Sequence, residues 1–317
     1  MSLSFLIRRL LGAIPLLFGI SLVLFTIIHL APGGPLDVYA DNPSVSAEAL
    51  DQIRARYGLD DPVPIQYVKW LSAMVVGDWG LSIRTGRPVL DEIVLRLGPT
   101  LLLGGISMAL AFCLALPLGV ISAARRGSRL DEAVTLGAFA GISLPVFWSA
   151  LLLQLIFSIW LGWLPSAGMK SVGDGSLSDR LLHLIMPVTV LSLATIASWS
   201  RYIRSGMIDV LGQDYIRTAY AKGRRETAVI ALHALRNAMI PAVTVIAIDF
   251  VTIISGAVIT ETVFAWPGIG RLFIESMNGR DYPMLMGLMM MGSVGVVLAN
   301  IIADLAYAAL DPRIRHG

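Results

Sequence analysis

Six hydrophobic stretches, separated by polar segments, constrain this chain of 317 residues more than any other feature. A transmembrane helix needs about 20 mostly apolar residues. The stretches that reach this length are 10–30, 99–123, 134–161, 184–200, 238–260 and 284–308. The fourth is the most interrupted, because Pro187 and several hydroxyl residues lie in it. With 56% hydrophobic and 15% charged residues, the composition favours lipid as the main solvent. The sequence predicts an all-α membrane protein with six transmembrane helices.

The distribution of basic residues predicts the orientation of these helices. Arg8 and Arg9 precede the first stretch, whose apolar run is longer than that of a cleaved signal peptide. The segment 201–237 carries many Arg and Lys residues, whereas the segment 32–97 has six Lys/Arg against nine Asp/Glu. Because cytoplasmic loops of membrane proteins are enriched in Lys and Arg, both termini and the 201–237 loop are expected in the cytoplasm. The chain is therefore predicted to be a multi-pass protein of the cytoplasmic (inner) membrane.

The loops divide the chain into four expected parts. These are the N-terminus with span 1 (1–31), an extracytoplasmic helical cap (32–97), a five-span core that includes the cytoplasmic loop (98–310), and a cytoplasmic C-terminus (311–317). The cap is too long for a plain connector and is expected to be structured. Its predicted helices are Ser46–Tyr57, Ile65–Val76 and Val89–Leu97. An interfacial cap and a lid that contacts ligand both fit this pattern.

The cytoplasmic loop contains a short amphipathic segment. Read as a helix from Asp214 to Lys222, it places Ile216, Ala219 and Tyr220 on one side, and Gly223 supplies a stop. Its basic residues can pair with acidic groups of a cytoplasmic partner, or the helix can lie on anionic lipid. Charge and periodicity alone do not separate the two interpretations.

Several sequence motifs resemble one family of transport proteins. The loop resembles the cytoplasmic signature of ATP-binding-cassette (ABC) importer permeases, in the variant form of the dipeptide, oligopeptide and nickel branch. In that branch the loop reads "DYxRTAxAKG" and "HALRNAxIP", here Asp214–Gly223 and His233–Pro241. Further matches are "GDWGLS" at Gly77–Ser82, "FAWPGIGR" at Phe264–Arg271, "RDYP" at Arg280–Pro283 and "DPRIR" at Asp311–Arg315. One departure is the Ala31–Pro35 segment, which lacks the Asp that the family commonly has before the last proline.

The resemblance implies a type I ABC importer permease whose loop helix docks on an ATPase subunit. The residues implied in ATPase coupling are Asp214, Tyr215, Arg217, Thr218, Ala219, Ala221, Lys222 and Gly223. The implied partners are a second, homologous permease in a heterodimer, two ABC ATPase subunits and an extracytoplasmic solute-binding protein. No phosphate-binding G-x-x-x-x-G-K-[ST] motif occurs in the sequence, so ATP and Mg²⁺ are expected on the partner ATPases and no cofactor on this chain. The implied solute is a di- or oligopeptide, with nickel, glutathione or an opine-like compound as alternatives.

Polar residues within the spans are candidates for function. Asp249 lies midway along span 5, where a carboxylate either lines the translocation path or bonds a neighbouring helix. Gln154 in span 3 is interpreted as an interhelical hydrogen-bond partner, with a path residue as the alternative. Between spans 5 and 6, aromatic residues flank a Pro-Gly turn, which fits a gate, a membrane anchor or, through the family, a contact with the binding protein. The residues singled out there are Phe264, Trp266, Pro267, Arg280 and Asp281.

Other functional classes find little support in the sequence. An intramembrane enzyme needs a convergent catalytic set, and none is predicted. The separated His29 and His183 do not make a metal site, and the single Cys113 cannot form an intrachain disulfide. A secondary transporter would favour inverted repeats with paired broken helices, and neither is clear. The net charge of +2 is too small to indicate nucleic acid.

Overall fold

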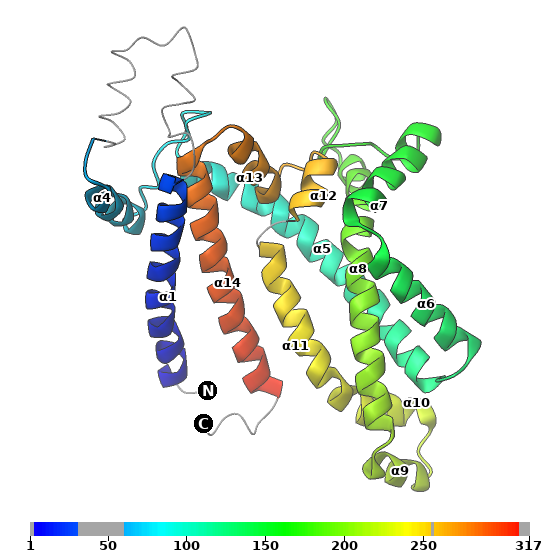
Figure 1. Ribbon diagram of the computed structural model, residues 1–317. Coiled ribbons are helices and arrows are strands. Elements are labelled where there is room, and N and C mark those ends of the chain that lie inside the picture. Colours follow the sequence, from blue (N-terminus) through cyan, green and yellow to red (C-terminus); the bar gives the residue numbers. More distant parts are fainter. Residues whose placement is uncertain (1–2, 31–59, 255–256, 311–317) are drawn as a thin grey trace.

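The structure is a bundle of long helices with short helices at both ends (Figure 1). The computed structural model describes residues 3–30, 60–254 and 257–310. The bundle contains α1 (Leu3–Leu30), α5 (Val89–Ala124), α8 (Leu177–Leu211), α11 (Leu235–Ile254) and α14 (Tyr282–Leu310). The described residues form no strand, only an isolated bridge between Leu81 and Pro88. The prediction of an all-α protein is confirmed.

All six predicted stretches coincide with helices, although not all are simple spans. Among the described residues, α1, α5, α8 and α14 are long and apolar enough to cross a membrane. The third stretch is broken into α6 (Arg129–Ser143), α7 (Val146–Leu153) and the π-helix η1 (Gln154–Trp160). This pair bends by 98° and makes a fifth span if it is counted as one. The fifth stretch forms α11, which is not in that count, and the beginning of α12 (Val258–Val263).

The position of the broken span differs from the sequence-based expectation. Pro187 lies inside a continuous α8 of 35 residues, so the fourth stretch is not the interrupted one. Hydroxyl groups bond back to the carbonyls of α8, as Thr189 does to Ile185 at 2.7 Å. The bend occurs instead before Pro145, where Leu144 is extended with ψ 122°. A proline disfavours helical backbone at the residue that precedes it, and here no continuous helix overrides that preference.

The segment between the first two spans is partly as predicted. Helix α4 (Val63–Val75) confirms the expected helix at 65–76, whereas the expected helix at 46–57 lies outside the described residues. The separate helix predicted at 89–97 is wrong, because α5 begins at Val89 and continues through Gly98 and Pro99. Contacts from a distant segment support the helix at this point: the indole N–H of Trp266 donates to the carbonyl of Pro99 at 3.0 Å.

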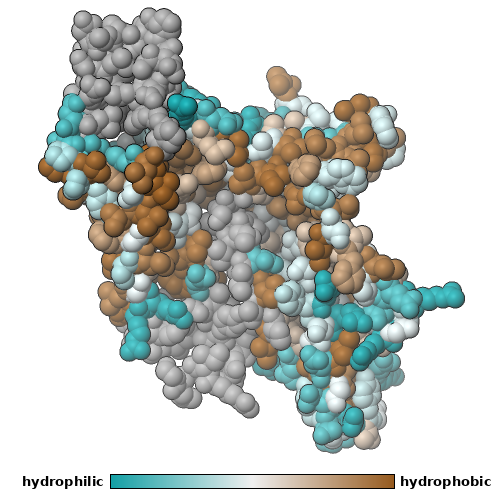
Figure 2. Space-filling model, viewed as in Figure 1, coloured by the Kyte–Doolittle hydropathy of each residue, from teal (hydrophilic) through white to brown (hydrophobic). Residues whose placement is uncertain are grey.

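The two ends of the bundle carry different elements. Figure 1 shows that α1 begins and α14 ends at the same end of the molecule as α9 (Asp214–Ala221) and α10 (Glu226–Val229). The opposite end carries α4, α12 and α13 (Ile269–Asn278). In Figure 2, hydrophobic residues spread across the molecule between these ends, and hydrophilic residues gather at the α9 end.

The core of the bundle lies where α8 meets α5 and α11. A Cβ at Gly119 of α5 would come within 2.7 Å of the Ser200 carbonyl, and one at Gly206 of α8 within 2.6 Å of the Ala238 carbonyl. The backbones therefore approach each other directly, as small residues allow in membrane helix pairs. Trp199, Ile203 and Met207 of α8 fill the cluster around these contacts.

Replacing Gly206 by alanine is expected to destabilise the bundle. The added methyl group would overlap with backbone, which cannot yield as a flexible side chain does, so a loss of about 1–3 kcal/mol follows. Gly137→Ala is the matched control, because a Cβ there meets nothing within 4 Å. Thermal unfolding of the purified protein in detergent measures the difference. Equal melting temperatures for the two variants would contradict the close packing of α8 on α11.

Candidate functional site

The α9 helix is a short, exposed element at one end of the bundle. Its observed bounds, Asp214–Ala221, agree with the predicted Asp214–Lys222 to within one residue. Asp214 lies in the first turn, where a carboxylate stabilises the helix dipole. Gly223 ends the helix with a φ of +73°, a conformation that glycine adopts without steric cost. The N–H of Gly223 donates to the carbonyl of Tyr220 at 2.9 Å.

One side of α9 is anchored in the core of the bundle. Ile216 is fully buried in a cluster with Val229, Ala234 and Met207, and Ala219 packs against the same cluster. Tyr220, predicted on that side, keeps 42% of its surface exposed. The supporting cluster comes from the bundle above α9, so only a narrow stripe of the helix is covered. Ile216 and Ala219 thus face the core of the chain itself, which the sequence did not predict, and Tyr220 does not share this burial.

The remaining predicted coupling residues lie on the open side. They are all exposed and comprise Asp214, Tyr215, Arg217, Thr218, Ala221, Lys222 and Gly223. The ion pair between Arg217 and Asp214 is long, at 3.5 Å, and both side chains are largely solvent-exposed, so it contributes little to stability. The Tyr215 hydroxyl accepts a hydrogen bond at 2.8 Å from the amide of Asn237 in α11. One side of α9 is thus attached to the bundle, and the opposite side is polar and exposed.

A cluster of polar groups near the α9 end of the bundle joins three helices. Arg204 of α8 donates to both carboxylate oxygens of Asp131 in α6, at 2.7 and 2.8 Å. Ser122 of α5 and the N–H of Gly127 donate to the same carboxylate. A bidentate pair is among the stronger hydrogen-bonded arrangements in proteins. Sequence reasoning missed this cluster, although Ser128 three residues before Asp131 is a helix-cap signal.

Asp249 faces a neighbouring helix and a cavity at the same time. Its carboxylate accepts a hydrogen bond from the indole N–H of Trp199 at 2.6 Å. It also lines a cavity of about 250 Å³ whose other polar lining residues are Ser107, Thr195 and Ser198. Both interpretations of this carboxylate, a helix-to-helix bond and a position on a polar path, therefore have a geometric basis.

A buried carboxylate organises the segment between α11 and α14 at the other end of the molecule. Glu261 of α12 is fully buried and accepts a hydrogen bond from Thr100 of α5 at 2.7 Å. It also accepts one from the backbone N–H of Arg271 at 3.0 Å. A Cβ at Gly268 would overlap with this carboxyl group, and one at Gly270 would come within 2.6 Å of Val258. Gly268 is thus required by Glu261 and Gly270 mainly by the backbone of Val258, and sequence reasoning did not single out Glu261.

Most of the predicted gate residues are buried within the chain. Phe264 and Trp266 are almost completely buried, and Pro267 is half-buried. Gln154 holds the segment from the side, because its amide donates to the carbonyls of Ser166 and Val263 at 2.8 and 3.1 Å. The prediction of Gln154 as a hydrogen-bond partner between elements agrees with these bonds.

Asp281 and Arg280 have different surroundings despite being adjacent. Arg280 is exposed, with a φ of +49°. Asp281 is buried and accepts hydrogen bonds from the hydroxyl of Ser82 and the N–H of Ile83, at 2.5 and 3.1 Å. Two motifs that are far apart in sequence, Gly77–Ser82 and Arg280–Pro283, therefore meet through this carboxylate. In this conformation Asp281 joins loops and has no surface to offer a partner.

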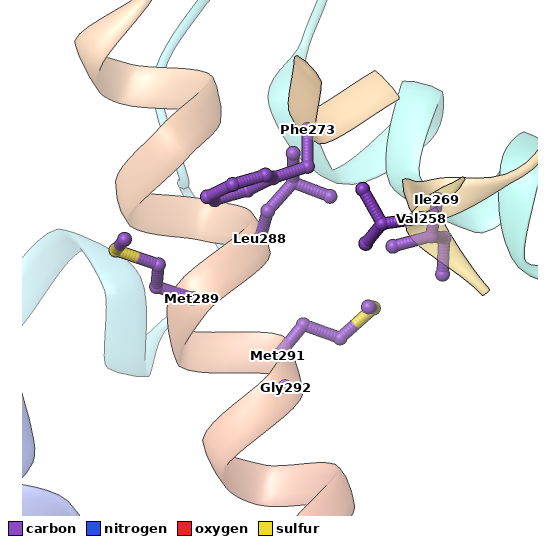
Figure 3. Close-up of a pocket in the computed structure, with 7 residues that line it drawn as sticks. All are labelled: Val258, Ile269, Phe273, Leu288, Met289, Met291 and Gly292. Carbon is purple, nitrogen blue, oxygen red and sulfur yellow. The ribbon is translucent and has the colours of Figure 1, made fainter. Parts of the chain in front are cut away.

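An apolar cavity lies beneath this outer segment (Figure 3). It has a volume of about 200 Å³ and is lined by Val258, Ile269, Phe273, Leu288, Met289, Met291 and Gly292. The Met291 side chain extends from α14 toward Val258 and Ile269. Methionine suits such a position, because its flexible side chain adapts to irregular space.

The described residues contain no group of three or more His, Cys, Asp or Glu side chains arranged for a metal ion. His183 bonds the carbonyl of Asp179 at 2.8 Å, and His29 bonds Gln66 at 3.0 Å. The two histidines belong to separate local networks, so the structure does not bring them together.

Comparisons with known proteins give consistent results over most of the chain. The family described as "Binding-protein-dependent transport system inner membrane component" matches residues 115–316, and its N-terminal counterpart matches residues 2–103. The chain is similar to the oligopeptide transport system permease AppB of Bacillus subtilis, at 44% identity over 99% of both chains. It is also similar to the dipeptide permease DppB of Escherichia coli K12, at 38% identity over 99% of both. A structure of the inward-facing MetNI methionine ABC transporter aligns with a TM-score of 0.56, at 17% identity, over 70% of this chain and 97% of that one. This last likeness concerns the fold.

The protonation of Glu261 is expected to affect stability. Burial raises the pKa of this carboxyl group, and its hydrogen bonds with Thr100, Arg271 and Gly270 offset only part of that effect. A raised pKa in the folded state means that the stabilisation is complete below the pKa of the unfolded chain. It is then lost as the pH rises through the folded pKa.

Replacing Glu261 by glutamine should therefore flatten the pH dependence of unfolding. The melting temperature of the purified protein, measured from about pH 5 to 8, should fall more steeply for the wild type than for Glu261→Gln. The substitution also changes the hydrogen bonds, which shifts the melting temperature by the same amount at every pH. The slope of melting temperature against pH is therefore compared, and not the melting temperature itself. Parallel curves would contradict a raised pKa at this site.

Proposed function

Because this chain belongs to the family of binding-protein-dependent transport system inner membrane components, we propose that it is the peptide-conducting permease of an ATP-driven importer. Its full-length relatives are permease subunits, and the chain is a transport component and not an enzyme. A permease of this family works in the membrane with an ATPase and a solute-binding protein. The peptide solute is inferred from what the relatives are named for, namely oligopeptides in AppB and dipeptides in DppB.

The observation that carries this proposal is the construction of α9. Seven of the eight predicted coupling residues are exposed, while Ile216 ties the helix to the core. A helix that only lay on lipid would turn its apolar face toward the membrane. In α9 the apolar face packs against the core of the chain itself, and the polar face is exposed. This arrangement favours a protein partner, and we assign that role to the ATPase.

Movement of α9 would reach the membrane helices through the contacts already described. Ile216 packs against Met207 of α8 and Ala234 beside α11, and Tyr215 bonds Asn237 of α11. The Asp131–Arg204 pair then connects α8 to α6. A displacement of the ATPase can therefore be passed on as a rigid-body motion between outward-open and inward-open states.

The assembly that we propose contains two ABC ATPases, which bind ATP and Mg²⁺, and a second homologous permease that completes a heterodimer. The ends of α1 and α14 at the α9 end of the molecule support cytoplasmic termini, as the basic residues do. Pro267 and Arg280 remain candidates for contact with the binding protein, because they retain surface. Phe264, Trp266 and Asp281 would take part only if the outer segment opened.

Asp249 is the proposed contact for the charged amino group of a peptide. Its cavity is polar on the side of α5 and α8, and a carboxylate attracts an ammonium group strongly where water is scarce. A nickel, glutathione or opine-like solute is the alternative for the same architecture, and it would use this carboxylate differently.

The role of α9 can be tested with a matched pair of tryptophan substitutions. Ala221→Trp places a bulky side chain on the open face of α9, whereas Ala231→Trp does so at an exposed position outside it. We expect Ala221→Trp to weaken ATPase association about tenfold or more, because overpacking an interface costs about 1–3 kcal/mol. Co-purification and solute-stimulated ATP hydrolysis measure the effect. Equal association of both variants with the ATPase would contradict the proposal that α9 couples the permease to it.

The role of Asp249 can be tested by separating its charge from its hydrogen bond. Asp249→Asn keeps an acceptor for Trp199 but removes the charge, and Trp199→Phe removes the donor but keeps the charge. We expect Asp249→Asn to raise the KM for peptides with a free amino terminus about tenfold, with little effect on N-acetylated peptides. Trp199→Phe should affect both kinds of peptide alike. An unchanged ratio of the two KM values in Asp249→Asn would remove this carboxylate from the path.

A further inference from the structure

A polar groove lies on α8 beside the cavity of Asp249. Figure 1 shows α11 on one side of α8 and α6 on the other. The groove is on the α6 side and has a volume of about 570 Å³, which is within the range of sites for small molecules. Two of its lining residues are apolar, and the others carry a hydroxyl or a guanidinium group. These polar lining residues are Thr135, Ser198, Arg201, Tyr202, Arg204 and Ser205.

The groove is continuous with the cavity of Asp249, because Ser198 lines both. Apart from Arg204, the α8 residues that line the two spaces follow one another at intervals of three and four, which places them on one face of the helix. All of them are half-buried or exposed: Leu191, Ala194, Thr195, Ser198, Arg201, Tyr202 and Ser205. A charged group on a spanning helix is costly in lipid, so this face is better suited to water, solute or protein.

Arg201 is the cation of this face that is available to a ligand. Its guanidinium carbon lies over the Phe139 ring of α6, 4.8 Å from the ring centre. Within the described part of the chain, Arg201 has no hydrogen bond and no ion pair. The attraction between its charge and the aromatic ring holds the side chain in place. This contact leaves the N–H groups of the guanidinium free to bind both oxygens of a carboxylate.

The acidic residues nearby leave the charge of Arg201 unbalanced. Asp131 is paired with Arg204, so those two charges offset each other. Glu132 of α6 and Asp209 of α8 lie nearer the α9 end, and neither lines the groove. Asp209 is eight residues from Arg201, about 12 Å along the helix axis. The groove thus has a net positive charge, and the cavity joined to it contains a carboxylate.

We infer that Arg201 binds the C-terminal carboxylate of a short peptide whose amino group lies at Asp249. The inference rests on the proposed function, which supplies the peptide and its contact at Asp249. Trp199, the partner of Asp249, and Arg201 are about 200° apart around α8, so the two charges are separated by about one helix diameter, roughly 10 Å. An extended peptide of two or three residues spans about 7–10 Å. Such a peptide can therefore place its opposite charges in the two joined spaces at once.

A lipid phosphate offers oxyanion chemistry similar to that of a peptide carboxylate. The continuity with the second cavity favours the peptide. The carboxylate of Asp249 attracts the ammonium end of a peptide, whereas it repels a phosphate that enters the same space.

The test measures peptide binding to the assembled permeases and ATPases in nanodiscs. The binding protein is omitted, so that only the membrane complex contributes to the affinity. The probes are trialanine, its C-terminal amide and its N-acetyl derivative. We expect Arg201→Gln to raise the Kd of trialanine about tenfold and to leave the Kd of the amide unchanged, because the amide offers the guanidinium no carboxylate.

Three further variants define the contact. Arg129→Gln is the matched control, because Arg129 is an exposed arginine of α6 that does not line the groove, and it should change neither Kd. Arg201→Lys, which keeps the charge but not the two-pronged geometry, should raise the Kd of trialanine by less than Arg201→Gln does. Phe139→Leu removes the ring that holds Arg201 and should also give a smaller rise, again for trialanine and not for the amide.

The outcomes separate this inference from the proposed function. If the wild type and Arg201→Gln bind trialanine equally, the carboxylate contact is wrong and the function stands. A rise that is equal for trialanine and its amide would give Arg201 a structural role and overturn the inference. Arg201→Gln should leave the preference for trialanine over its N-acetyl derivative intact, since that preference belongs to Asp249.

Two other results would also overturn the inference. If the wild type binds none of the three peptides, the proposed peptide function fails, and the contact at Arg201 fails with it. If Arg201→Gln changes only the retention of phosphatidylglycerol, measured by native mass spectrometry, while the peptide affinities stay the same, the groove belongs to a lipid headgroup.

Discussion

The α8 helix packs so closely against α5 and α11 that backbone meets backbone at Gly119 and Gly206. With 35 residues it is about 50 Å long, which exceeds the apolar thickness of a bilayer of about 30 Å. One continuous helix therefore extends from Arg180 near its outer end, past Trp199 beside Asp249, to Arg204 and the start of the α9 loop. Every site discussed above contacts this helix or an element packed directly on it.

Buried charges explain why the short segments at the ends of the bundle have one conformation. A carboxylate is costly to bury unless its oxygens accept hydrogen bonds. Asp281 meets this requirement by binding the loop at Ser82 and Ile83, and Asp131 does so with Arg204. Glu261 goes further, because its space exists only where Gly268 has no side chain. In each case the hydrogen bonds that one buried carboxylate accepts join segments that are far apart in the sequence.

The sequence was sufficient for the parts of the fold that depend on periodicity and length. The hydrophobic stretches located the long helices, and the spacing of Ile216 and Ala219 located α9, although not the burial of that side in the chain's own core. The effect of the prolines was predicted less accurately. Pro187, expected to interrupt its span, lies within an intact helix, and the break is at Pro145 instead. A proline's local preference is weak enough for packing to override, and packing cannot be read from one sequence. Glu261 was missed for the same reason, because its partners Thr100 and Arg271 come from elements that only the fold brings together.

The position of α8 also bears on how two partners at opposite ends of the molecule can influence each other. Energetic coupling between distant sites needs a packed element with discrete arrangements that both sites bias. Near the outer end of α8, Leu184 and Val188 share a buried cluster with Trp266 of the outer segment, and α9 follows directly after the inner end of α8. On the outer side Glu261 joins α12 to α5 and to the start of α13, and on the inner side Asp131 of α6 pairs with Arg204 of α8. Glu261 and Trp266 hold the outer segment, and Asp131 and Arg204 join the helices at the inner end, so the contacts along α8 form one continuous packed connection between the two ends of the molecule.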